Sequence, residues 1–81
     1  MSILSNEDLR ELSVQQLLKL WHKAEAELRN TNERINSLFD SLAEKSEKES
    51  LKTSLIDLIE HRHALDDFIA RIIQVVSRRV A

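Results

Sequence analysis

Apolar residues recur at every seventh position in the first half of the chain: Val14, Trp21, Leu28, Ile35 and Leu42. The positions between them form a second row: Leu17, Ala24, Thr31 and Leu38. Alternating steps of three and four residues place both rows on one side of an α-helix. The pattern therefore predicts one long helix, from Val14 to Leu42 or Ala43, that packs against other helices.

The second half of the chain carries a wider apolar surface and is predicted to be helical from Glu47 to Arg79. Two of its rows repeat at every seventh position, Leu51, Leu58, Leu65, Ile72 and Leu55, Ile69, Val76, with Ile59, Phe68, Ile73 and Val75 beside them. The opposite row is wholly polar: Thr53, Glu60, Asp67 and Gln74. One partner helix cannot cover so wide an apolar surface. We therefore expect contacts on two sides, as in a four-helix bundle.

Capping signals mark where the helices begin. Ser5 precedes a first turn rich in acidic residues and predicts a short helix of one or two turns that includes Leu9 and Leu12. Ser13 and Gln16 have the spacing of a capping box, in which each side chain satisfies a free backbone amide of the other residue. The first long helix is thus expected to start after Ser13.

The connection between the long helices is predicted within residues 44–50, which contain no apolar side chain. Ser46 and Glu49 form a further capping box there and shorten the break to three or four residues. A connection this short forces the two helices to run antiparallel. Each helix of about 30 residues is expected to be about 45 Å long.

Length and composition favour association of two copies. A domain of 81 residues has a marginal core, and the absence of Cys excludes reinforcement by disulfides. The predicted fold is all-α: an antiparallel hairpin of two long helices with a short N-terminal helix, dimerising into a four-helix bundle. Residues 1–12 form the N-terminal arm or short helix, and residues 13–81 form the hairpin dimerisation domain. The residues expected at the dimer or partner interface are Trp21, Leu28, Ile35, Leu58, Leu65, Phe68, Ile69, Ile72 and Val76.

Both long helices lose their apolar pattern at the same height. If the hairpin turns near Ser46, Thr31 in the first helix faces the region of Arg62 in the second, and both residues interrupt apolar rows. The predicted central polar layer consists of Thr31, Asn32, Glu33, His61, Arg62 and His63. One interpretation is structural, because a buried polar residue fixes the register and the oligomeric state of packed helices. The other is a partner-binding or pH-responsive site, since histidines titrate near neutral pH.

Candidate chemistry is sparse. Glu60 and His63 have the spacing found in carboxylate-bridged di-metal bundles, with Glu33 as a third type of ligand, but Glu60 belongs to the outward polar row. The serines have no histidine and carboxylate at a recognisable catalytic spacing, and there is no Cys nucleophile. We therefore expect no metal, no cofactor and no enzymatic activity.

Charge and hydropathy argue against some classes of binding partner. A net charge of −2 lacks the basic excess of a nucleic-acid-binding domain. Met1–Leu12 has no basic region leading into an apolar block, so no signal peptide is expected. The most apolar run, Phe68 to Val76, is far shorter than the ~20 residues that span a bilayer. We expect a cytoplasmic protein that does not bind membranes.

Two patterns resemble small helical bacterial regulators. The second helix resembles that of the AriR-type biofilm and acid-resistance connector proteins, through Ser54-Leu55-Ile56, Glu60, Asp67-Phe68-Ile69, Arg71, Val75-Val76 and Arg78, with Trp21 where that family has an aromatic residue. The first helix is similar to that of the TraM-type quorum-sensing antiactivators, through Asp8-Leu9, Leu12, Lys23-Ala24-Glu25 and Leu28. Either resemblance implies a non-enzymatic helical dimer that regulates transcription by binding a regulator protein.

Three classes of function follow. The first is a regulatory or adaptor protein that binds other proteins through helices, forms a homodimer and modulates a bacterial transcriptional regulator. The second is a secretion chaperone or assembly scaffold that lends its apolar second helix to a helical client. The third is a nucleic-acid-associated protein that uses Arg71, Arg78 and Arg79.

Overall fold

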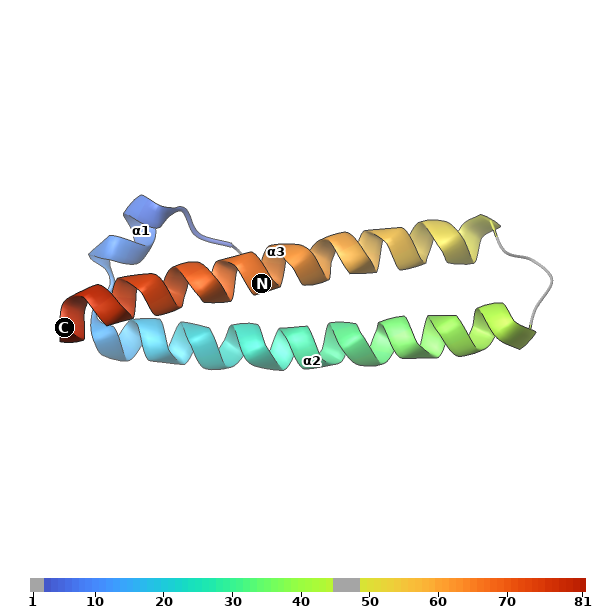
Figure 1. Cartoon of the computed structure of the whole chain (residues 1–81), viewed down its shortest axis with the longest axis horizontal. Coiled ribbons are helices and arrows are strands. Elements are labelled where there is room, and N and C mark those ends of the chain that lie inside the picture. Colours follow the sequence, from blue (N-terminus) through green and yellow to red (C-terminus); the bar gives the residue numbers. More distant parts are fainter. Residues whose placement is uncertain (1–2, 45–48) are drawn as a thin grey trace.

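The computed structural model describes residues 3–44 and 49–81, and over these residues it consists of three α-helices (Figure 1). Helix α1 spans Asn6–Glu11, α2 spans Val14–Glu44 and α3 spans Glu49–Val80. The two long helices lie side by side and antiparallel, and the molecule is a rod of 52 × 18 × 17 Å. The predicted all-α hairpin with a short N-terminal helix is confirmed.

The predicted caps before α1 and α2 are formed. The Ser5 hydroxyl accepts a hydrogen bond from the Asp8 amide at 3.3 Å. At the start of α2, the Gln16 side chain accepts from the Ser13 amide at 2.9 Å and the Ser13 hydroxyl accepts from the Gln16 amide at 3.2 Å. This reciprocal pair satisfies free amides at the helix start, so α2 begins where the sequence predicts.

The far ends of the long helices extend slightly beyond the predicted limits. Helix α2 continues to Glu44, and α3 continues to Val80. The predicted start of the second helix at Glu47 and the capping role of Ser46 lie outside the described residues.

The core is built from the rows that face each other across the hairpin. Its buried side chains come from all three helices: Leu9, Leu17, Ala24, Ile35, Leu65, Phe68 and Ile72. On α2 the row of Leu17, Ala24 and Thr31 is the most deeply buried. The small side chains of Ala24 and Thr31 let the two helix backbones approach closely, since the residues at the contact set the distance between helix axes.

The polar row of α3 faces solvent, as its composition predicts. All four of its residues, Thr53, Glu60, Asp67 and Gln74, are exposed. The assignment of the apolar and polar sides of α3 is therefore confirmed for a single hairpin.

Two arginines of α3 fasten the N-terminal segment to the hairpin. Arg71 donates hydrogen bonds to the Leu4 carbonyl at 2.9 Å and to the Asn6 side chain at 3.3 Å. Arg79 donates to the carbonyls of Leu12 and Arg10. Carbonyls at the end of a short helix lack intrahelical partners, so the Arg79 guanidinium acts as a cap. Helix α1 is thereby held beside the C-terminal part of α3 (Figure 1).

The burial pattern predicts a large difference between two alanine substitutions on α3. Leu65 is fully buried, whereas Glu60 is exposed. Leu65→Ala should lower the free energy of unfolding by about 2–5 kcal/mol, because it removes buried methyl groups and leaves a cavity. Glu60→Ala, the matched control, should change it by less than about 0.5 kcal/mol. Urea denaturation followed by circular dichroism measures both, and equal losses would contradict the described packing.

Candidate protein-interaction site

One long side of the hairpin exposes apolar side chains from both helices. On α2, each residue that directly follows a buried one, such as Leu18 after Leu17, points about 100° further around the helix. The same holds on α3, for example for Ile73 after Ile72. Arg62 of α3 donates to the Asn32 side chain of α2 at 3.4 Å, so these rotated rows lie on the same side of the hairpin. We call this side the open face. It comprises Leu18, Trp21, Glu25, Leu28, Asn32, Phe39, Leu42, Lys52, Leu55, Ile59, Arg62, Asp66, Ile69, Ile73 and Val76.

Exposure on the open face is high for such large apolar residues. Leu18 and Ile73 are 39% exposed and Phe39 is 52% exposed, and Ile56 at the edge of the face is 56% exposed. A single exposed apolar residue is ordinary, but a contiguous set along one side marks an interaction surface. The open face is therefore the candidate site for a protein partner.

Trp21 is the largest side chain on this face and is half-buried. Its ring packs against the core cluster, and its indole N–H donates to the Glu25 carboxylate at 2.8 Å. The polar end of the ring is thus satisfied within its own helix. A partner can therefore cover the indole ring without leaving its N–H unpaired.

The opposite side of the hairpin has a different character. Near the chain ends it is covered by α1, and toward the hairpin tip it forms an open groove of about 1000 Å³. The groove is lined mainly by polar and charged residues of both signs: Glu27, Asn30, Thr31, Glu33, Arg34, Ser37, Leu38, Ser54, Asp57 and Leu58. We call it the polar groove.

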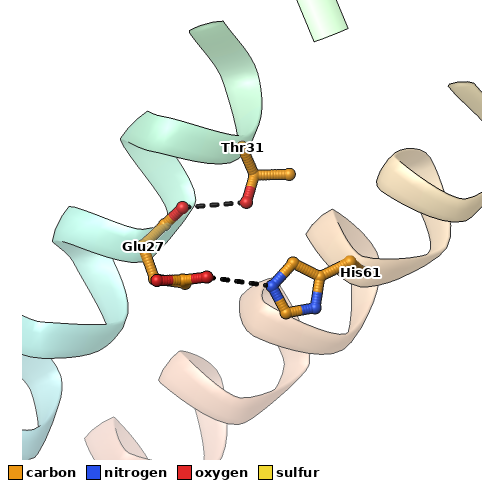
Figure 2. A network of polar contacts seen from close by, with 3 residues as sticks. All are labelled: Glu27, Thr31 and His61. Carbon is orange, nitrogen blue, oxygen red and sulfur yellow. Dashed lines mark hydrogen bonds and ion pairs between the residues drawn. The ribbon is translucent and has the colours of Figure 1, made fainter. Parts of the chain in front are cut away.

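Part of the central layer links the two helices on the groove side (Figure 2). Thr31 is only 3% exposed, and its hydroxyl donates to the Glu27 carbonyl at 2.8 Å. The Glu27 carboxylate lies 3.3 Å from His61 Nε2 across the hairpin. Glu27 was missed by sequence reasoning, although it precedes Thr31 by one helical turn and so lies on the same side of α2.

The other cross-helix contact of the layer is the hydrogen bond between Arg62 and Asn32 on the open face. Four of the six residues expected in the layer thus take part in polar contacts: Thr31 and His61 each contact Glu27, and Arg62 contacts Asn32. Glu33 and His63 are exposed and take no part in them. The direction of each side chain, and not the height of its backbone alone, decides membership of the layer.

The residues expected at the interface divide into two groups. Leu65, Phe68 and Ile72 are fully buried and Ile35 is 2% exposed, because they pack inside one hairpin. The others are half-buried: Trp21, Leu28, Leu58, Ile69 and Val76. Leu18 and Phe39 were not predicted at the interface. The polar residues Glu25 and Asn32 stand between them in the same seven-residue row, so this row is not apolar throughout.

Other candidate chemistry finds little support in the geometry. Within residues 3–44 and 49–81, no group of three or more His, Asp or Glu side chains is arranged to hold a metal ion. None of the described helices is both long enough and apolar enough to cross a membrane. Arg71 and Arg79, two of the three arginines considered for nucleic-acid binding, are engaged with backbone carbonyls of the N-terminal segment.

Comparison of the chain with protein-family models, with curated proteins and with solved structures gives no match. The resemblance to AriR-type and TraM-type regulators stays a hypothesis that rests on the residues given above.

Thr31 offers a test of why the apolar row of α2 contains a polar residue. Thr31 and Thr53 both donate to the carbonyl four residues earlier, but only Thr31 is buried between the helices. Thr31→Leu should destabilise the hairpin by about 1–3 kcal/mol, because Thr31 is only 3% exposed and a larger side chain there displaces its packed neighbours. Thr53→Leu should have an effect below about 0.5 kcal/mol. If thermal unfolding shows that Thr31→Leu is stabilising, tight packing is not the reason for threonine at this position.

Proposed function

We propose that this chain is a non-enzymatic regulatory or adaptor protein that works through helix-mediated protein–protein binding. In this proposal it is a homodimer, with two hairpins packed into a four-helix bundle. The observation that carries the proposal is the open face, where exposed apolar side chains of α2 and α3 run along the length of the rod. Such a face gains stability when it is removed from water.

The dimensions of the rod support a stable dimer. The rod is 52 Å long and 18 Å wide, so a second hairpin can cover the open face along its length. The face also has the composition of an interface centre, with a tryptophan and several aliphatic side chains around a small polar region.

We further propose that the dimer modulates a bacterial transcriptional regulator, as the resemblance to AriR-type and TraM-type proteins implies. If the open face holds the dimer together, α1 and the polar groove remain available to this partner. Glu27, Arg34 and Asp57 give the groove charges of both signs. Polar contacts of this kind suit a partner that binds and leaves, since interfaces that form reversibly are more polar than permanent ones.

The alternatives make different use of the same surfaces. A secretion chaperone would keep the open face for a client helix, and the purified chain alone would then be a monomer. A nucleic-acid-binding protein would need free basic side chains, but Arg71 and Arg79 are engaged with the N-terminal segment and the net charge is −2. The regulatory dimer is therefore the favoured proposal.

The dimer is tested by sedimentation equilibrium and by thermal unfolding at several concentrations. We expect a dimeric mass at tens of micromolar and a melting temperature that rises with protein concentration, as mass action requires. Ile73→Asp should produce a folded or partly folded monomer, because it places a charge on the open face. Gln74→Asp, one position further on the exposed polar row, should remain dimeric. A folded monomer for the unmodified chain would refute the dimer.

The partner is tested by cross-linking in cells followed by affinity purification and mass spectrometry. Recovery of a transcriptional regulator that is lost when Arg34 and Asp57 in the groove are replaced by Ala would support the proposed function. Exposed residues on the polar row, such as Glu60, provide the control substitution. Recovery of nucleic acid, with binding that weakens steeply as salt rises, would favour the third class of function instead.

A further inference from the structure

The open face of α3 has the same pattern in both directions from Ala64. Two residues away on either side are Arg62 and Asp66, which carry opposite charges. Five residues away are Ile59 and Ile69, and nine residues away are Leu55 and Ile73. Oppositely charged residues flank the centre and the next two pairs outward are apolar, whereas the pair twelve residues away, Lys52 and Val76, differs in character.

The open face of α2 has a similar centre at Asn30. Nine residues away on either side are Trp21 and Phe39, and twelve residues away are Leu18 and Leu42. All four of these residues are apolar, whereas the inner pairs differ in character: Leu28 and Asn32 lie two residues away, and Glu25 and Ile35 lie five residues away.

The two centres lie at one height along the rod. The hydrogen bond between Asn32 and Arg62 sets the level of the antiparallel helices, and it places Asn30 level with Ala64. This level is also the middle of α2, which spans Val14–Glu44, and of α3, which spans Glu49–Val80.

The complementary charges at equal distances from Ala64, with apolar pairs beyond them, suit one particular symmetry. When a twofold axis crosses a helix at right angles, each residue before the axis contacts a residue equally far beyond it in the other copy. Resting on the proposed dimer, we infer that the partner on the open face is a second copy of this chain, packed with the two hairpin tips at opposite ends. The axis passes at the level of Asn30 and Ala64, so that Arg62 of each copy pairs with Asp66 of the other.

This arrangement gives the charges of the face their partners. Within one hairpin, Arg62 is half-buried and its described hydrogen bond, to the uncharged Asn32, is long at 3.4 Å. Covering the face would bury the guanidinium further, which is costly unless it meets a carboxylate. Packing with the tips at the same end would place Arg62 over Asn32 of the other copy, again an uncharged group. With the tips apart, both Arg62–Asp66 pairs form.

The same arrangement also keeps the apolar surfaces of the two rods in contact along their length. Because the axis crosses the middle of both long helices, the two rods cover each other along almost their whole length. Trp21 then lies over Phe39 of the other copy at each end, a contact that suits two aromatic rings. Helix α1 does not obstruct the contact, because Arg71, which holds Leu4 and Asn6, stands in the same row of α3 as Asp57 on the groove side.

Distances between spin labels distinguish the two packings. The chain has no Cys, so Glu44→Cys and Asn30→Cys, both at exposed positions, each introduce one labelling site per copy. Glu44 lies 14 positions from the axis level, so with the tips apart its two labels are separated by about 42 Å along the rod. With the tips together, they lie within about 25 Å, since adjacent helix axes are about 8–10 Å apart. Labels at Asn30, the control, lie within about 25 Å in both packings.

Long Glu44 distances with short Asn30 distances are expected. A dimer with short distances at both positions would overturn the inference but leave the proposed dimer standing. A monomer would overturn both. Pulsed electron spin resonance thus separates failure of the packing from failure of the proposed function.

Exchange of the paired charges tests the contact itself. Arg62→Asp and Asp66→Arg should each raise the dimer dissociation constant at least about tenfold, because like charges then meet across the axis. The double variant, in which the two residues exchange places, should return the constant to within about threefold of the original. Circular dichroism of each variant verifies that the helices remain. A double variant as weak as the single ones would overturn the pairing.

Discussion

The close packing of α2 against α3 is the constraint on which the remaining structure depends. Ala24 and Thr31 are small enough for the helices to approach, while Leu65, Phe68 and Ile72 fill the space between them. A helix that packs against one neighbour buries only part of its circumference. Two helices with apolar residues over a wider arc therefore leave apolar surface exposed, and this remaining surface is the open face.

The N-terminal segment makes the two sides of the hairpin different. Arg71 and Arg79 fasten α1 on one side, where Leu9 adds to the core. The other side keeps its exposed leucine, isoleucine and phenylalanine side chains. One side is thus partly covered and otherwise polar, while the other is open and apolar. We propose that the open side binds a second copy and that the polar side remains for a regulatory partner.

The middle of the rod combines both kinds of surface. Glu27 and His61 connect the helices on the groove side, and Asn32 and Arg62 connect them on the open face. Polar contacts at a fixed height favour one alignment of the helices, because a shift by one turn would separate the partners. Thr31, Asn32, His61 and Arg62 are four of the six residues that the sequence places at this height. The sequence did not predict Glu27, or that Glu33 and His63 point to solvent, since these depend on side-chain direction.

The sequence by itself determined the helices, their antiparallel order and the solvent-facing side of α3. Helix caps and seven-residue apolar repeats depend on residues close together along one helix. They can therefore be recognised without knowledge of the fold, as Ser13 with Gln16 illustrates. Only the tertiary structure decided which apolar rows become core and which stay exposed. Trp21 and Leu17 look equivalent in the sequence, yet Leu17 is fully buried and Trp21 is half-buried. The physical reason is the rotation of α2 about its own axis, which is fixed by packing against α3 and α1 and not by any interaction within α2.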